Sequence, residues 1–332
     1  MGKSLARSSS PPDGLQRVDP TVTERARQLP ASGEIFLDHV GWYVPHLDDV
    51  ARSFGRLGFP LTPSSIHGDR DPETGAIIPQ GSANRLAVLE RGYLEFLSDV
   101  EGTETPVGNH LRREMDRYVG VHLIAFSVSD AVGEADRLAG DGFRLQPTVN
   151  LRRTIEGADG ADVEVAFTVV RAEFGSIPEG RIQTLTHHSP EHVWQRRYMA
   201  RENGIVGLAE VVFSVADPVA SAGRLAKFTG RSAIETETGM SVQLDRGKLT
   251  FFEPKDVPRK LGIQAMPEAP ATVAIGLISH DLGKTREFMR AQGVHLAVDE
   301  PNRLIVEPDE ALGSALIVYP AHEVPTLGNE SP

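Results

Sequence analysis

The chain has 332 residues, of which 40% are hydrophobic, and a formal net charge of −12. This length suggests about two domains, and the acidic charge argues against a nucleic-acid or anionic-membrane partner, because both need a basic face. There is no cysteine, which excludes disulfides, thiolate zinc sites and cysteine nucleophiles. Any metal site must therefore use His, Asp, Glu or Gln side chains.

The N-terminal residues 1–32 are predicted to form a disordered arm, with one short helix around Val22–Gln28, because basic residues lead into a Ser- and Pro-rich stretch. No apolar run follows the basic residues, so no signal peptide is expected. No window reaches 18 apolar residues, so no transmembrane helix is expected either. We therefore expect a cytoplasmic protein that binds a small molecule.

An internal repeat organises the rest of the chain. Four stretches share an apolar strand, a turn, an amphipathic segment and a glycine that ends it, beginning at residues 39, 123, 210 and 274. In the first stretch Leu47, Val50 and Phe54 fall at helical spacing, and Gly58 fits a left-handed helix stop. Because two or three short apolar runs follow each helix, each stretch predicts a β-α-β-β-β module.

Two polar residues interrupt the apolar strands of the first module. His39 lies in the middle of the run 35–44, and Glu95 lies in the middle of the run 92–97. A single histidine in a strand is commonly a buried, hydrogen-bonded residue, but an ionised glutamate in mid-strand is costly to bury without a partner. A metal ion bound by both side chains explains the two residues together.

A family resemblance rests on particular motifs. Leu37-Asp38-His39-Val40, Gly81-Ser82-Ala83-Asn84-Arg85-Leu86, Tyr93-Leu94-Glu95-Phe96 and the run 186–194 resemble the glyoxalase-like domain family of the vicinal oxygen chelate superfamily, which also contains extradiol dioxygenases and bleomycin-resistance proteins. The motif resemblance covers residues 34–200, whereas residues 205–320 share only the module pattern.

The resemblance implies an α+β fold in which four βαβββ modules pair into two cupped mixed β-sheet half-barrels with helices outside. The expected domains are an N-terminal one at 33–203 and a ligand-poor C-terminal one at 204–320, followed by a tail at 321–332. The sequence leaves open whether the modules pair within one chain or between two chains of a homodimer.

In this superfamily the metal ligands come from the first and last strands of the modules and point into the cup, and His39 and Glu95 match these positions. Period-2 alternation places Leu37, His39, Gly41 and Tyr43 on one face. In the second module Leu123 is opposite His39, so His122 becomes a ligand only with a bulge or a shifted register. His187 is inward-facing if its strand extends that far.

Substrate-binding candidates lie near these positions. Gln183 is opposite Glu95 in the second module. His188 faces away from the cup and also fits a capping or surface role. Asn84 fits either a substrate carbonyl or a turn. Arg85 fits either a substrate carboxylate or a solvated strand end.

The third and fourth modules hold Glu210, Thr250, Ala274 and Leu316 at the aligned ligand positions, so the site is expected in the N-terminal half. The resemblance implies one divalent ion (Fe, Zn, Mn or Ni) and lyase or isomerase chemistry on a substrate with vicinal oxygens, with Glu95 as ligand or general base. A ring-cleaving non-haem iron dioxygenase remains an alternative, and so does a metal-free binding protein of the bleomycin-resistance type.

Overall fold

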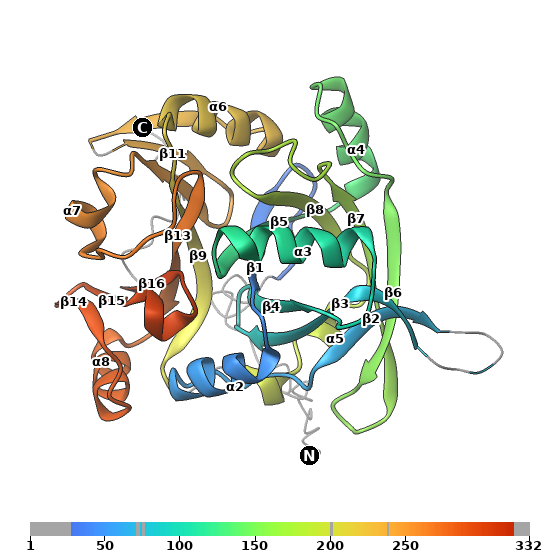
Figure 1. The fold of residues 1–332 in the computed structure, drawn as a ribbon, viewed down its shortest axis with the longest axis horizontal. Coiled ribbons are helices and arrows are strands. Elements are labelled where there is room, and N and C mark those ends of the chain that lie inside the picture. The colour runs from blue at the N-terminus through green and yellow to red at the C-terminus, as the bar shows by residue number, and fades with distance from the viewer. Residues whose placement is uncertain (1–27, 71–73, 75–76, 200–201, 238, 322–332) are drawn as a thin grey trace, which may run out of the picture.

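The computed structural model describes residues 28–70, 74, 77–199, 202–237 and 239–321. Most of the predicted arm and tail lies outside these residues. The described strands form two eight-stranded mixed sheets, one from each half of the chain, and Figure 1 shows the two halves side by side with helices around them. The predicted α+β architecture of four modules in two sheets is confirmed, and the modules pair within one chain.

The N-terminal sheet has the strand order β2-β3-β4-β1-β5-β8-β7-β6. Its first module comprises β1 (Ile35–Tyr43), α2 (Leu47–Arg56), β2 (Ser65–Arg70), β3 (Ile77–Val88) and β4 (Tyr93–Asp99). Helix α3 (Pro106–Arg117) then leads to the second module, which comprises β5 (Gly120–Val128), α4 (Ala131–Gly140), β6 (Val149–Glu156), β7 (Asp162–Arg171) and β8 (Arg181–His187).

The C-terminal sheet repeats this order as β10-β11-β12-β9-β13-β16-β15-β14. The short elements α5 (Pro190–Val193) and η1 (Arg196–Tyr198) precede its third module, made of β9 (Ile205–Ser214), α6 (Pro218–Thr229), β10 (Ala233–Thr236), β11 (Gly239–Gln243) and β12 (Lys248–Phe252). After α7 (Val257–Leu261), the fourth module follows as β13 (Ala271–Ser279), α8 (Leu282–Ala291), β14 (Leu296–Glu300), β15 (Arg303–Val306), η2 (Pro308–Ala311) and β16 (Ala315–Pro320).

Local sequence explains where several helices begin. The Asp130 side chain accepts from the first backbone amides of α4, and Asp217 and Asp281 do the same for α6 and α8. Such caps satisfy amides that have no partner inside the helix. Each helix then turns an apolar face to the sheet, as Val50 and Phe54 of α2 do.

One large apolar core joins the convex sides of both sheets. Trp42 and Phe126 of the N-terminal sheet belong to the same cluster as Phe213 and Phe228 of the C-terminal half. The Trp42 indole Nε1 donates to the Ala311 carbonyl at 3.0 Å, which ties β1 to η2. The two halves therefore share one core on their convex sides, and the concave sides of the sheets lie outside that core.

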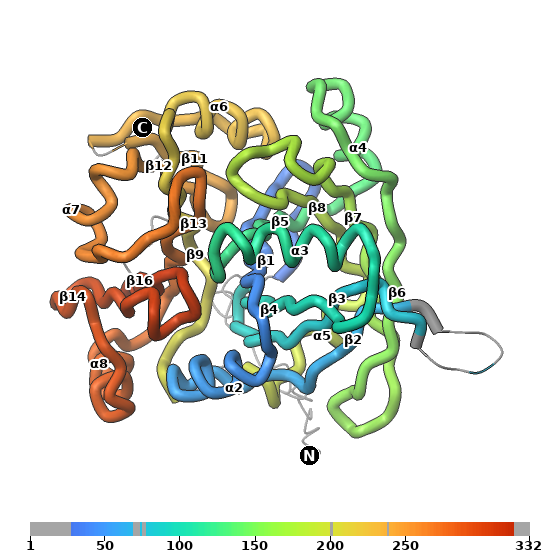
Figure 2. The backbone as a smooth tube through the Cα atoms, in the orientation of Figure 1, coloured from blue at the N-terminus to red at the C-terminus, as the bar shows by residue number. Residues whose placement is uncertain are grey.

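The two concave sides differ. On the C-terminal sheet, Val212, Ala274 and Ile317 pack against Val257 and Leu261 around α7, so apolar side chains fill the cup. On the N-terminal sheet, α3 packs against β1, β3 and β4 at one end of the cup, and it crosses in front of β1 and β5 in Figures 1 and 2. The remainder of this cup encloses a cavity.

A bulge in β1 changes the predicted facing of its residues. The pairing of β1 with β5 shifts between Leu37 and His39, so Asp38 is an extra residue in the ladder. Leu37 consequently packs in the convex core with Val40, whereas His39 faces the cup. The prediction that Leu37 and His39 share a face was wrong, because the bulge reverses the alternation.

Candidate functional site

A cavity of about 700 Å³ occupies the cup of the N-terminal sheet. Residues of both edge strands line it, including His67 of β2 and Arg153 of β6, so the sheet curls until its two edges approach one another. This volume lies in the range of small-molecule sites. Strands β2 and β3 form a hairpin along one wall of the cavity.

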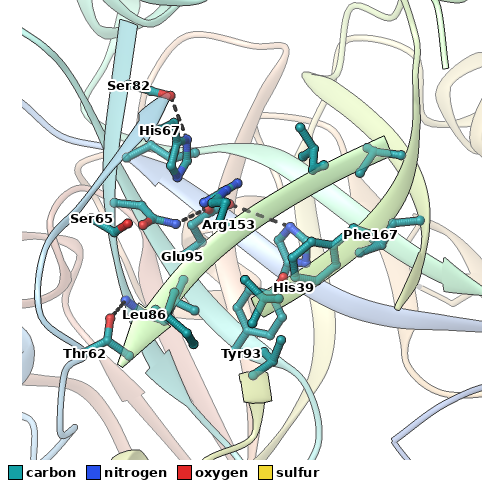
Figure 3. A pocket seen from close by; sticks show the side chains of 18 of the residues that line it. His39, Thr62, Ser65, His67, Ser82, Leu86, Tyr93, Glu95, Arg153 and Phe167 are labelled. Atoms are coloured by element: carbon teal, nitrogen blue, oxygen red, sulfur yellow. Dashed lines mark hydrogen bonds and ion pairs between the residues drawn. The ribbon is translucent and has the colours of Figure 1, made fainter. Parts of the chain in front are cut away.

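His39 and Glu95 meet inside this cavity. His39 Nε2 lies 3.7 Å from Glu95 Oε2, and both side chains are nearly buried. Glu95 Oε1 accepts a hydrogen bond from Asn84 Nδ2 at 2.7 Å, so Asn84 orients the carboxylate. Figure 3 shows Glu95 and His39 directed toward one another. The Tyr93 ring stacks on the His39 imidazole with 4.4 Å between centroids. The imidazole is thus fixed from several sides.

Asp38 is the main feature that sequence reasoning missed. Its fully buried carboxylate lies 2.7 Å from His39 Nδ1 through Oδ1 and 3.0 Å from His187 Nε2 through Oδ2. The β1 bulge makes this possible, because it lets adjacent residues serve one cluster. An Asp directly before a strand histidine was a visible signal, but regular alternation would turn it to the opposite face.

The charge state of Asp38 determines the tautomer of His39. Burial alone raises the pKa of the Asp38 carboxyl, but the charge and hydrogen bonds of His187 and His39 outweigh burial and hold this pKa well below its usual range. An ionised Asp38 accepts protons only, so His39 carries its hydrogen on Nδ1. In the neutral imidazole the Nε2 lone pair then faces Glu95 and the cavity, and this is the form that ligates a metal.

The other two predicted histidine ligands lie outside the cavity lining. His187 is inward-facing on β8, as expected, but it reaches Asp38 and packs against Trp194. The bulge required for His122 is present, since the β1–β5 pairing shifts between Gly41 and Trp42. His122 nevertheless stacks with Tyr43 and Tyr118, and its Nε2 lies 2.8 Å from the Tyr118 carbonyl oxygen.

Of the four predicted substrate-binding residues, two line the cavity and two do not. Asn84 and Gln183 line the cavity, and Gln183 Oε1 accepts from Arg171 Nε at 3.3 Å. Arg85 and His188 do not line it. His188 is exposed and its Nε2 is 2.8 Å from the Thr168 hydroxyl. Arg85 is turned away because it follows Asn84 on β3, where successive side chains alternate.

Besides Arg152, which pairs with Glu164, three arginines of the second module line the cavity: Arg153 of β6, Arg171 of β7 and Arg181 of β8. Burial, together with the neighbouring Arg181 and Arg153, lowers the pKa of Arg171 to about 9. Figure 3 shows Arg153 beside Glu95. Sequence reasoning missed all three, because a charged residue in an alternating strand usually faces solvent.

Equivalent positions of the C-terminal sheet can be read from its register. Glu210 takes the place of His39 and Thr250 that of Glu95, while Ala274 takes the place of Leu123. The position equivalent to Gln183 is Ile317, not Leu316, since Ile317 pairs with Gly276, which in turn pairs with Glu210. Glu210 is buried and contacts Lys248, Thr250 and Tyr319 within its own sheet.

The sequence of this chain matches one known protein family. Residues 37–229, more than half of the chain, match the family model described as "Glyoxalase-like domain". The chain belongs to the glyoxalase-like domain family. A search of curated proteins finds no match to this family member. The resemblance predicted from the His39 and Glu95 motifs is confirmed.

Solved structures share the fold of this glyoxalase-like protein at low sequence identity. A hypothetical protein from Staphylococcus aureus is 11% identical with a TM-score of 0.60, covering 86% of this chain and 99% of its own. A xylose isomerase-like TIM barrel/4-hydroxyphenylpyruvate dioxygenase fusion protein is 12% identical (TM-score 0.52; 92% and 51% covered). A mutant 4-hydroxymandelate synthase from Streptomyces coelicolor is 14% identical (TM-score 0.50; 86% and 93% covered). At these identities the likeness shows the vicinal oxygen chelate fold.

Two negative findings apply to the described part of the glyoxalase-like chain. Within it, no helix has the length and apolar character needed to cross a membrane. No three His, Asp or Glu side chains of the described residues come together as a metal-binding group. The candidate ligands that line the cavity are the His39–Glu95 pair and the amide of Gln183.

Proposed function

We propose that the N-terminal cavity is the active site of a divalent-metal-dependent lyase or isomerase, with His39 and Glu95 as the principal ligands and Gln183 as a weaker third. One observation carries the proposal. With Asp38 holding the Nδ1 proton, the lone pair of His39 Nε2 and the Glu95 carboxylate face one another at 3.7 Å. Two electron-rich groups at this distance favour a cation between them.

The donor set fits such an ion. Ligand atoms about 2.1 Å from a common metal lie roughly 3.0–3.5 Å apart at right or tetrahedral angles, so a small side-chain adjustment closes the 3.7 Å separation. One imidazole, one carboxylate and one amide suit Fe, Zn, Mn or Ni, with water at the remaining positions. A bound ion would supply Lewis-acid stabilisation of a substrate with two vicinal oxygens.

The protein's own groups supply positioning and proton transfer. Asp38 holds the His39 tautomer, and Asn84 holds one oxygen of Glu95 and leaves the other directed into the cavity. As the alternative to ligating an ion, that oxygen can accept a proton from a substrate carbon next to a carbonyl, which is the general-base step of an isomerase or lyase. The enclosed cup, with Leu123 and Phe167 in its wall, limits the water around this step.

The placement of His187 favours this reaction class over ring-cleaving oxygenation. Non-haem iron oxygenases use two histidines and one carboxylate around a single ion. His187, the candidate for the second histidine, is held at Asp38 and does not line the cavity. The dioxygenase alternative would therefore require His187 to leave its buried position, or His67, which lines the cavity, to serve as the second histidine.

Metal content tests the proposal. Purified wild-type protein should bind one Fe, Zn, Mn or Ni ion per chain by elemental analysis. His39→Ala and Glu95→Ala should bind it at least 100-fold more weakly, whereas His188→Ala, an exposed histidine outside the cavity, should match wild type. Glu95→Gln, which keeps a ligand oxygen, should retain more metal but lose solvent deuterium exchange into an α-hydroxy ketone probe. Wild-type protein that binds none of these ions would contradict the proposal and favour the alternative of a metal-free binding protein.

A further inference from the structure

Positive charge is concentrated in the cavity of a strongly acidic chain. Arg153, Arg171 and Arg181 come from three adjacent strands, and none has a carboxylate of a described residue within the 4.0 Å ion-pair distance. Most other arginines in the described structure have such a partner. Arg152, which adjoins the same cavity, is one example, since it pairs with Glu164 at 2.5 Å.

The two glutamates that line the cavity have other partners. Glu95 lies between Asn84 and His39, and the other glutamate of the lining, Glu156, pairs with Arg197 at 2.9 Å. Burial lowers the pKa of Arg153, although Glu95 and Tyr93 oppose that shift. Keeping several uncompensated guanidinium groups in a partly buried site costs free energy, and a bound anion would remove that cost.

The arginines are arranged for a ligand rather than for folding. Arg171 uses Nε to hold Gln183, which leaves its two terminal nitrogens for another acceptor. Arg181 packs over the Phe174 ring at 5.4 Å and has a buried Nε without a hydrogen-bond partner. A planar guanidinium presents paired donors that match a carboxylate. The surrounding wall is apolar, with Leu151, Phe167 and Leu185 among its residues.

We infer that this cavity takes an organic acid, with its carboxylate held by Arg153, Arg171 and Arg181 and its apolar body against the β6–β8 wall. The inference rests on the proposed function in one respect: the same molecule would present its two vicinal oxygens to His39 and Glu95. Recognition of the acid group itself depends on the arginines alone. A neutral dicarbonyl or catechol would leave the three charges uncompensated.

The test compares matched acids and neutral analogues by calorimetry on chelator-treated protein. The probe pairs are 3,4-dihydroxyphenylacetate with its methyl ester, and benzoate with benzamide. Wild type should bind each acid at least tenfold more tightly than its analogue. Because a charged hydrogen bond contributes about 1.5–3 kcal/mol, Arg171→Met or Arg181→Met should weaken acid binding about 10- to 150-fold and leave binding of the neutral analogues unchanged.

Controls separate this inference from the metal proposal. Arg85→Met, which removes an arginine outside the cavity lining, should keep the acid preference. If an Arg→Met variant fails to fold, Arg171→Lys and Arg181→Lys keep the charge and should give a smaller loss. Acids that bind no better than their analogues to wild type, or an acid preference that survives both Met variants, would overturn the inference. Loss of metal binding in His39→Ala with the acid preference intact would leave it standing.

Discussion

Replacement of Asp38 by asparagine tests the central charge of the site. The carboxylate is fully buried and accepts from His39 Nδ1 at 2.7 Å and His187 Nε2 at 3.0 Å. Asparagine has nearly the same shape as aspartate, but only one of its two terminal side-chain atoms accepts a hydrogen bond. Its amide NH2 group would therefore face the N–H group of either His39 or His187. Losing one charged hydrogen bond and weakening the other should cost about 3 kcal/mol of unfolding free energy.

The same change should weaken the metal site. Without the negative charge, His39 is no longer held with its proton on Nδ1, and loss of such a supporting carboxylate typically costs 10- to 100-fold in metal affinity. Urea unfolding measures the stability, and titration of apo-protein with Zn²⁺ measures the affinity. Asp116→Asn, an exposed change on α3, is the control. Wild-type stability together with wild-type affinity in Asp38→Asn would refute the assigned role of Asp38.

Three further predictions concern other parts of the two sheets. Burial lowers the pKa of His122 from 6.5 to about 4, so between these values the unfolded chain binds the extra proton and stability falls as pH falls. His122→Phe should therefore reduce the stability loss between pH 8 and pH 5 by about 2 kcal/mol in urea unfolding; an unchanged loss would contradict the burial argument. Leu123→His should add an imidazole at the position equivalent to His39 and tighten Zn²⁺ binding at least tenfold in titrations, unless the added ring turns away from the cavity. Glu210→Gln should destabilise the protein by about 1–3 kcal/mol, because it weakens the contacts with Lys248 and Tyr319, and should leave metal binding unchanged; altered metal content would place a site in the C-terminal sheet.

Local sequence pattern was enough to predict the modules and two residues that line the cavity. Helical spacing, stop glycines and apolar runs are short-range signals, and they determine βαβββ units wherever the chain repeats them. His39 and Glu95 were identifiable because a polar residue inside an apolar strand stands out against its neighbours. Their meeting in space also followed, since the first and last strands of a module are adjacent in this fold, as β1 and β4 are.

The parts of the site that could not be predicted depend on bulges in the strands and on the curvature of the N-terminal sheet. Asp38 joins His39 only through a β-bulge, and an extra residue in a ladder has no distinct sequence signature. His122 shows the complementary error, because its bulge is present but places the ring under α3 between tyrosines. The cavity arginines could not be predicted because they face the cavity only as a result of the curl of the sheet. This curl turns one face of the edge strand β6 inward.

The duplicated sheets show why one cup carries a candidate site and the other does not. At the position of His39, the C-terminal sheet has Glu210, whose charge is met by Lys248 within the same sheet. At the position of Gln183 it has Ile317, which packs in the apolar filling around α7. Among the described residues, the C-terminal cup thus pairs its buried glutamate within the sheet and is filled by apolar side chains. The N-terminal cup keeps a lone-pair nitrogen opposite a carboxylate and three arginines without carboxylate partners among the described residues, and these unmet charges define what it can bind.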